Sequence, residues 1–123
     1  MTMKTETQLL ASQTIAANGS APAFSARAAD ALEIIVDCAG VAGTTPSLTF
    51  VLNYIDPNTG LPYPVPGVTF TAITAALTTP LRVVVDPLED RDLQLTWTVT
   101  GTTPSFTGVS VTVNLIQRSP ANA

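Results

Sequence analysis

Residues 92–115 read DLQLTWTVTGTTPSFTGVSVTVNL, and this stretch decides the fold class. Apolar and polar residues alternate on both sides of its centre, in residues 93–99 and again in residues 109–115. Successive side chains of a β-strand point to opposite faces, so each run predicts a strand with one buried and one solvated face. Threonine suits the solvated row, because its branched Cβ fits the pleat while its hydroxyl faces water.

Alternation of period two also predominates in the rest of the chain. We count about seven predicted strands, one within residues 8–16 and the others at 31–39, 47–55, 67–74, 81–86, 92–100 and 107–116. Short alternating strands separated by proline and glycine turns are typical of a single-domain antiparallel β-sandwich or jelly roll. We expect this domain to span residues 8–116, with residues 1–7 and 117–123 as flexible ends and residues 17–30 as a connecting loop.

The connections between the predicted strands contain a repeat. The pentapeptide Gly-Thr-Thr-Pro-Ser occurs at residues 43–47 and again at residues 101–105, and each copy predicts a hairpin loop. Two interpretations stay open: a pseudo-symmetric, duplicated domain, or simply a sequence that makes a good loop. Residues 56–60, Asp-Pro-Asn-Thr-Gly, predict a further turn, with its glycine where positive φ is needed.

The proline-rich stretch LPYPVPG at residues 61–67 cannot form a central strand. Each proline lacks the backbone N–H that a central strand must donate. The stretch is therefore predicted as an edge segment or as a polyproline-like strip.

The composition excludes several classes of protein. The 123 residues include five Lys and Arg, nine Asp and Glu and no His, which gives a formal net charge of −4. Apolar residues make up 46% and charged residues 11%, which argues against a charged disordered chain. Five scattered basic residues cannot neutralise a run of phosphates, so we expect no nucleic-acid partner. One cysteine and no histidine exclude a disulfide within the chain, an ordinary zinc site and a Ser-His-Asp triad.

We also expect no targeting signal in this sequence. No stretch approaches the ~18 apolar residues of a membrane span. The first residues contain Lys4 and Glu6 and lack the apolar core of a signal peptide. We therefore predict that the protein is made in a cytoplasm and has no membrane partner.

Few side chains could carry chemistry. The acidic residues that cluster between two predicted strands are Asp86, Glu89, Asp90 and Asp92. Their spacing does not match a calcium-binding loop, so we interpret them as a solvated loop. Glu33 and Asp37 share one strand face without a sign of a cleft, and we interpret them as solvent-facing rather than catalytic. Cys38 follows an apolar run and is predicted to be a small buried hydrophobe. We predict no catalytic residue, no metal ligand and no cofactor.

The aromatic residues divide into two groups. Trp97 and Tyr54 lie on apolar rows and are predicted to pack in the core. Tyr63 lies between prolines and is the aromatic side chain predicted to be exposed, either to contact a partner or to pack back on its own sheet. The predicted partner-contact residues are Tyr63, Pro62, Pro64, Phe24 and Arg27.

Several of these segments, taken in order, resemble a family of small virion structural proteins from tailed bacteriophages. The segments are residues 8–12 with 16–20, residues 32–37 followed by 43–49, the turn 56–60 with Tyr63, and residues 95–99 followed by 101–106. The resemblance covers about residues 8–115, and the order of the segments carries it. Cys38-Ala39 and the proline-rich residues 61–67 depart from the pattern of the family.

This resemblance implies a structural protein in or on the virion. Within that role the sequence favours a capsid decoration or cement protein that binds the outside of the major capsid protein lattice through residues 1–7, 17–30 and 61–67. The implied partners are the major capsid protein and other virion proteins, with self-association, a trimer included, left open. The alternatives are a tail, baseplate or head-fibre module, or a carbohydrate-binding adhesion module that uses Tyr63.

Overall fold

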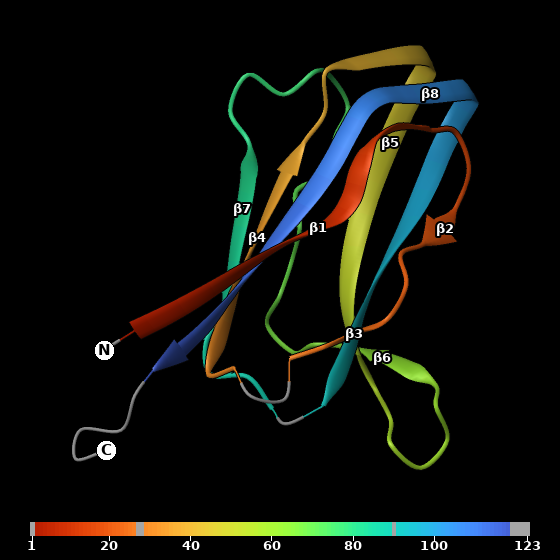
Figure 1. Ribbon diagram of the computed structural model, residues 1–123. Helices are drawn as coiled ribbons and strands as arrows, with labels where there is room; N and C mark the ends of the chain where they lie inside the picture. The colour runs from red at the N-terminus through yellow and green to blue at the C-terminus, as the bar shows by residue number, and fades with distance from the viewer. Residues whose placement is uncertain (1, 27–28, 90, 119–123) are drawn as a thin grey trace.

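The structure is a computed structural model that describes residues 2–26, 29–89 and 91–118. Its strands form one antiparallel sheet that curls over on itself (Figure 1). The eight strands are β1 (Thr2–Ile15), β2 (Gly19–Ser20), β3 (Phe24–Ser25), β4 (Ala31–Asp37), β5 (Gly40–Ile55), β6 (Pro62–Pro64), β7 (Leu81–Val85) and β8 (Asp92–Arg118). The predicted antiparallel β-sandwich is confirmed, with eight strands in place of about seven. Within the described ranges, no helix is long and apolar enough to cross a membrane.

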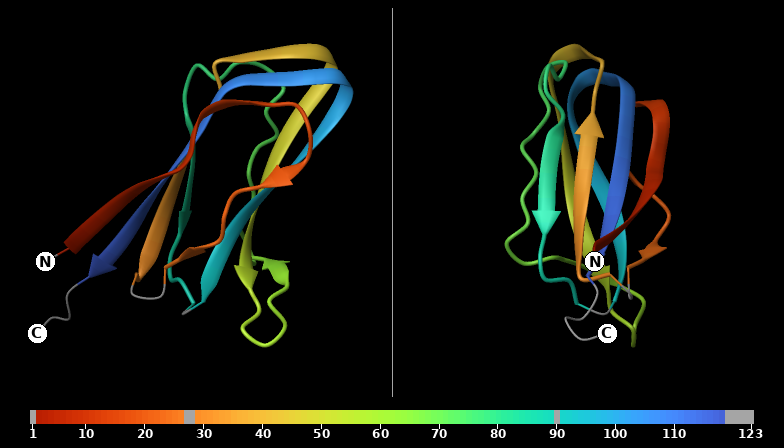
Figure 2. Two further views of the ribbon diagram at one scale, coloured as in Figure 1. Left: turned by 45° about the vertical axis from the view of Figure 1, so that its right-hand side comes forward. Right: turned by 60° about the vertical axis from the view of Figure 1, so that its left-hand side comes forward.

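Two layers arise because β5 and β8 bend together. Below the bend, Ser47–Tyr54 of β5 pair with Leu93–Thr100 of β8, and β6, β2 and β3 extend this first layer. Beyond the bend, the second half of β8 pairs with β4 and β1, and β7 extends this second layer from β4. Figure 2 shows both strands passing over the top of the molecule from one layer to the other.

The bend corrects the prediction of two hairpin loops. Residues 43–47 lie inside β5 and residues 101–105 lie inside β8, so neither copy of the repeated pentapeptide ends a strand. The two copies pair with each other, with Thr44 opposite Thr102. The separately predicted strands 92–100 and 107–116 are therefore parts of one strand. The sequence did not show this, because a cluster of glycine and proline is found both in loops that end a strand and in bends within paired strands.

Matched backbone conformations produce the bend on both strands. Gly43 and Gly101 have φ of 113° and 114°, and Thr45 and Thr103 have φ of 47° and 44°. A Cβ atom on Gly43 would lie 2.7 Å from the carbonyl oxygen of Thr103, and one on Gly101 would lie 2.8 Å from that of Thr45. Glycine is therefore required at both positions, by conformation and by the close approach of the facing backbone.

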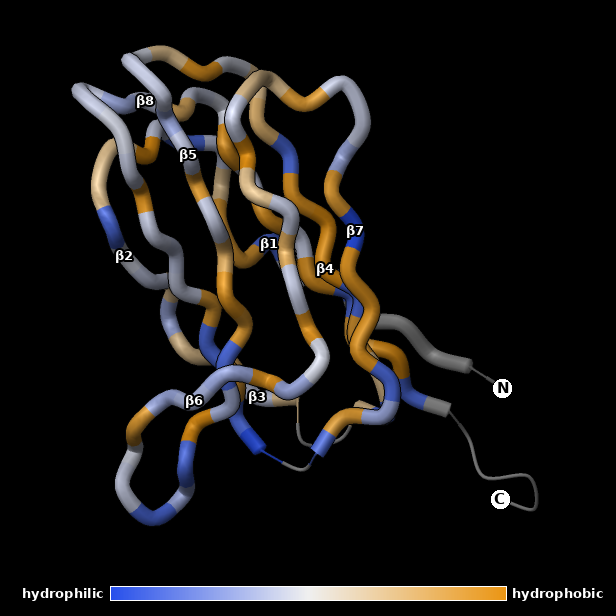
Figure 3. Tube along the Cα trace, turned by 180° about the vertical axis from the view of Figure 1, so that it is seen from behind, coloured by the Kyte–Doolittle hydropathy of each residue, from blue (hydrophilic) through white to orange (hydrophobic). Residues whose placement is uncertain are grey.

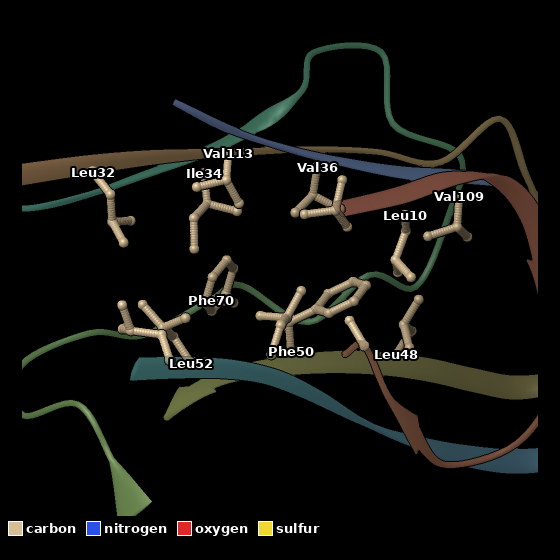
Figure 4. Packing of buried hydrophobic residues seen from close by; sticks show 14 of the residues in the cluster. Leu10, Leu32, Ile34, Val36, Leu48, Phe50, Leu52, Phe70, Val109 and Val113 are labelled. Atoms are coloured by element: carbon tan, nitrogen blue, oxygen red, sulfur yellow. The ribbon is translucent and has the colours of Figure 1, made fainter. Parts of the chain in front are cut away.

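The core lies between the two layers and confirms the predicted apolar rows. Figure 4 shows Leu32, Ile34, Val36 and Val113 of one layer facing Leu48, Phe50 and Leu52 of the other, with Phe70 between them. Tyr54 is buried as predicted, with 2% of its surface exposed. Cys38 is buried as well, and its thiol donates to the carbonyl oxygens of Gly40 and Thr107. Burial raises the pKa of this thiol, which fits the prediction of an inert core residue.

The segment between β6 and β7 closes one side of the sandwich, and Figure 3 shows it running between β5 and β7. The strand predicted at residues 67–74 is wrong, because the segment contributes only an isolated bridge between Ile73 and Leu48. Phe70 and Ile73 are both buried and are three residues apart. In a strand, residues three apart point to opposite faces, so this spacing does not fit a strand with one buried face. The buried side chains of the segment fill the space between the layers.

The opposite side is closed by residues 17–26, which were predicted as part of a connecting loop. This segment contains the two-residue strands β2 and β3, which pair with the first half of β8. Its small side chains Ala21 and Ala26 are buried. Strands of two residues carry too little alternation to be detected in a sequence.

Residues 2–7, where the sequence predicts a flexible end, pair with residues 113–118 of β8. These two segments form the ribbon that projects from the sandwich in Figure 2. Of the other predicted flexible end, residues 119–123 lie outside the described residues. Flexibility in solution stays a prediction for both ends.

The bend makes a direct test of the fold. We expect Gly43→Ala or Gly101→Ala to lower the free energy of unfolding by about 3 kcal/mol, because each adds strain and pushes the facing backbone away. Gly60→Ala is the control, because Gly60 also has positive φ but has no atom near its would-be Cβ; it should cost about 1 kcal/mol. Chemical denaturation measures all three, and equal effects would contradict the paired bend.

Trp97 tests the assignment of strand faces. Its ring is partly buried, lies 5.9 Å from Phe50 at an interplanar angle of 63°, and its Nε1 donates to the carbonyl oxygen of Ala17. We expect Trp97→Ala to lower the free energy of unfolding by about 3 kcal/mol. Thr98→Ala, at the exposed neighbouring position, should change stability little. Near-normal thermal stability of the Trp97 variant would show that the faces of β8 are reversed.

Candidate interaction surface

One row of side chains crosses four strands at the end of the sandwich opposite the bend. Tyr63 of β6 is opposite Tyr54 of β5, Tyr54 is opposite Leu93 of β8, and Leu93 is opposite Phe24 of β3. Directly opposed residues share one face of a sheet, so all four side chains lie on the inner face. Tyr54 and Leu93 are buried, whereas Tyr63 and Phe24 at the two ends of the row are partly exposed.

This row shows how two of the predicted contact residues are placed. The ring of Tyr63 packs on Tyr54, with centroids 5.8 Å apart and an interplanar angle of 48°. The sequence left two alternatives open for Tyr63, contact with a partner or packing back on its own sheet. The structure shows the second, because the side chain is partly buried on its own sheet. Phe24 is likewise partly buried against the core. Arg27 lies outside the described residues.

Pro62 and Pro64 flank Tyr63 on the solvent side of β6, and both are exposed. They pair with Ile55 and Asn53 at the outermost position of the first layer. The prediction of an edge segment is confirmed. Because proline has no N–H, this edge cannot accept a further fully hydrogen-bonded strand.

The turn before β6 presents the most exposed large hydrophobic side chain among the described residues. Asp56 accepts hydrogen bonds from the Asn58 N–H at 2.9 Å and from the Thr59 hydroxyl at 3.0 Å. These bonds lower the pKa of the Asp56 carboxyl. The predicted turn is thus confirmed, and it holds Leu61 with 65% of its surface exposed. Leu61 lies within the predicted contact segment 61–67 but was not among the contact residues named individually, although an apolar residue directly after a polar turn was a signal for it.

Residues 86–89 and 91 complete this end of the molecule, beside the turn. The Glu89 N–H donates to the Tyr54 hydroxyl at 3.1 Å, and Arg91 forms an ion pair with the Glu89 carboxylate. We call the surface formed by Phe24, residues 56–64, residues 86–89 and Arg91 the β6 end. A groove of about 380 Å³ runs beside it, lined by Tyr54, residues 65–68 and residues 84–89.

The outer-face pairs between residues 47–53 of β5 and residues 94–100 of β8 contain no charged residue and are polar except for Val51. These pairs are Ser47–Thr100, Thr49–Thr98, Val51–Thr96 and Asn53–Gln94. Asn53 is buried, and its side-chain amide donates to the Gln94 carbonyl and to the Thr96 hydroxyl. The network satisfies these groups internally, so it serves the fold of the layer.

Within residues 2–26, 29–89 and 91–118, no group of three or more His, Cys, Asp or Glu could hold a metal ion. Asp90 of the predicted acidic loop lies outside these ranges. Glu33, one of the two weighed carboxylates, forms an ion pair with Arg82 and accepts from Asn114, while Asp37 is exposed. The β6 end presents apolar, aromatic and charged side chains at the surface.

Comparison with known proteins finds similarity in structure only. No family model matches the chain, and no curated protein matches it in sequence. Among solved structures, the SPBc2 prophage-derived protein YomS is similar with a TM-score of 0.56 and 15% identity, over 95% of this chain and 96% of that chain. At this identity the similarity shows a shared fold.

Two further similar structures belong to larger chains. A structure of infectious bursal disease virus, Gx strain, matches with a TM-score of 0.53 and 8% identity over 93% of this chain and 32% of that chain. The CBM22-1 and GH10 modules of endo-1,4-β-D-xylanase 10B from Clostridium thermocellum match with a TM-score of 0.51 and 14% identity over 97% of this chain and 25% of that chain. The fold is therefore shared with a prophage-derived protein, a virus particle and a xylanase structure.

The Asp56 turn gives a pH-dependent test of the β6 end. The folded state lowers the pKa of Asp56 below 3.8, so its stabilising effect is present above that pH and is lost as the pH falls through the folded-state pKa. We expect Asp56→Ala to lower the melting temperature at neutral pH and the difference from the unmodified protein to shrink in acid. Thermal denaturation across this range measures it, with Asp37→Ala as the exposed control. A difference that persists unchanged in strong acid contradicts the assigned role.

Proposed function

We propose that this protein is a structural component of a bacteriophage virion, and that it decorates or cements the outer surface of the capsid. The observation that carries the proposal is the similarity to the prophage-derived protein YomS over nearly the whole of both chains. The fold match to the infectious bursal disease virus structure agrees with a role in a virus particle. The partners in this proposal are the major capsid protein and other virion proteins, and its location is the virion.

The surface chemistry fits docking on a repeated lattice. The chain has a net charge of −4 and few charged residues, so it requires no nucleic acid to balance its charge. The β6 end combines the exposed Leu61 with the partly exposed side chains of Tyr63 and Phe24. Aromatic and apolar side chains at the centre of a contact, surrounded by polar residues, are the usual composition of an interface core. Many copies of a modest contact then hold together by avidity.

Co-sedimentation with capsids assembled from the coat protein of the same phage tests this proposal. We expect the purified protein to sediment with the shells, in a copy number comparable to that of the coat protein. We expect Leu61→Glu to weaken shell binding at least tenfold, because it places a charge at the centre of the contact. Thr98→Glu, on the outer face of β8, is the matched control and should bind normally.

The copy number separates this proposal from the related ones. A tail, baseplate or head-fibre module would be present in purified particles at a small fraction of the coat protein. The absence of the protein from particles, together with no sedimentation with shells, would overturn a virion role altogether.

A carbohydrate-binding module is the second candidate function. The fold match to the xylanase structure favours it, and the Tyr54–Tyr63 ring pair lies close to the groove beside the β6 end. The half-covered Tyr63 ring offers less stacking surface than an open aromatic platform. Calorimetry with xylo-oligosaccharides decides: binding that is lost in Tyr63→Ala supports this candidate, and no binding removes it.

A further inference from the structure

The free edges of the sheet differ in how they are protected. Open strand edges invite pairing with other chains, and proteins block them with prolines, bulges or very short strands. β6 carries Pro62 and Pro64, β2 and β3 have two residues each, and the register of β1 shifts at three places between Gln8 and Ile15. β7 has none of these devices. Within the described residues it is paired with β4 alone and stands at the end of the strand order.

Figure 1 shows β7 at one side of the sandwich, next to β4. Its sequence, Leu-Arg-Val-Val-Val, is rich in β-branched residues, which suit strand pairing. Pro80 precedes it and Pro87 follows it closely, so an added ladder would be limited to this short stretch.

The solvent-facing row of β7 has an ordered charge pattern. Arg82 forms an ion pair with Glu33 of β4 and still has 63% of its side chain exposed. Val84 is 44% exposed, and Asp86, two positions further and directly after the strand, is exposed. The row therefore reads cation, apolar residue, anion. Reversed in direction, it reads anion, apolar residue, cation, so the row is complementary to an antiparallel copy of itself.

We propose that β7 is the docking edge for a second copy of this chain, paired antiparallel and centred on Val84. In this register Val84 faces Val84 of the copy, and Arg82 faces Asp86 of the copy on both sides of the centre. Opposite charges across a strand pair stabilise it, and like charges destabilise it. A shift that centres the pair on Arg82 would place the two arginines opposite each other, and a centre on Val83 would leave each Arg82 opposite a valine.

The added ladder lies between Pro80 and Pro87, so the contact is confined to β7 and the residues next to it. The pairing has two-fold symmetry and uses the same edge on both chains, so it closes at a dimer and does not propagate into a fibre.

Sedimentation velocity and light scattering over a range of concentrations test the dimer. We expect the unmodified chain to dimerise and Val84→Lys to raise the dimer dissociation constant at least tenfold, because two lysines would then face each other. Leu61→Lys is the matched control, since Leu61 is also an exposed hydrophobic residue but lies at the β6 end, and it should dimerise normally. A monomer at every concentration, or a dimer unaffected by Val84→Lys, overturns the proposal.

A charge exchange tests the register. Arg82→Glu alone places a second carboxylate opposite Asp86 of the copy, and Asp86→Lys alone places an ammonium group opposite Arg82 of the copy. We therefore expect each variant to be a folded monomer by circular dichroism and sedimentation. A dimer of one variant with the other has two facing pairs. One is the native pair of Arg82 and Asp86, and the other joins the introduced glutamate to the introduced lysine. Both pairs are attractive, so we expect dimers to return on mixing. A mixture that stays monomeric while the unmodified chain dimerises overturns this register.

A cross-link provides a readout that does not depend on the charged variants. Val84→Cys should form a disulfide-linked dimer under mild oxidation, because residue 84 faces its own copy, whereas Leu61→Cys should not. Failure of Val84→Cys to cross-link more readily than Leu61→Cys contradicts the pairing. All of these measurements use the isolated chain without capsids, so their failure and the failure of the virion proposal are separate results.

Discussion

The paired bend of β5 and β8 is the constraint on which the rest of the structure depends. β8 alone pairs with five of the other strands, and the two remaining strands attach to its neighbours β5 and β4. Both layers of the sandwich are therefore halves of the same long ribbon, and they face each other only because that ribbon turns over at residues 43–47 and 101–105. Two glycines with positive φ and two threonines in the left-handed region make the turn without breaking the ladder.

A folded ribbon leaves open sides and open edges, and the chain treats them differently. Irregular segments close the two sides with buried side chains, so the core is complete without further strands. Prolines, short strands and register shifts block most edges, whereas β7 keeps a regular, self-complementary edge. The two exposed large hydrophobic residues among the described residues lie at the boundary of the molecule, Leu61 at the β6 end and Val84 in β7. A β7-linked dimer would present two β6 ends, which would strengthen attachment to a repeated lattice.

The candidate surface was partly visible in the sequence. Prolines on both sides of Tyr63 predicted an edge with an aromatic residue, and the edge is there. The orientation of that ring depended on the register between β6 and β5, which places Tyr63 opposite Tyr54 and turns it inward. Val84 was not recognised because it lies in a run of three valines, where alternation does not tell which side chain is exposed. Its neighbours in the sheet decide that.

Alternation by itself determined the all-β class, most of the inward-facing residues and the turn at residues 56–60, because these depend on neighbours one to four positions away. Only the tertiary structure decided that the repeated pentapeptides face each other inside two long strands. It also decided that residues 67–74 close the side of the core without forming a strand, and which edge remains open. Each of these depends on pairing between residues far apart in the chain. The pentapeptide alone is compatible with a loop or with a bend inside a strand, and only its pairing with the other copy decides between them.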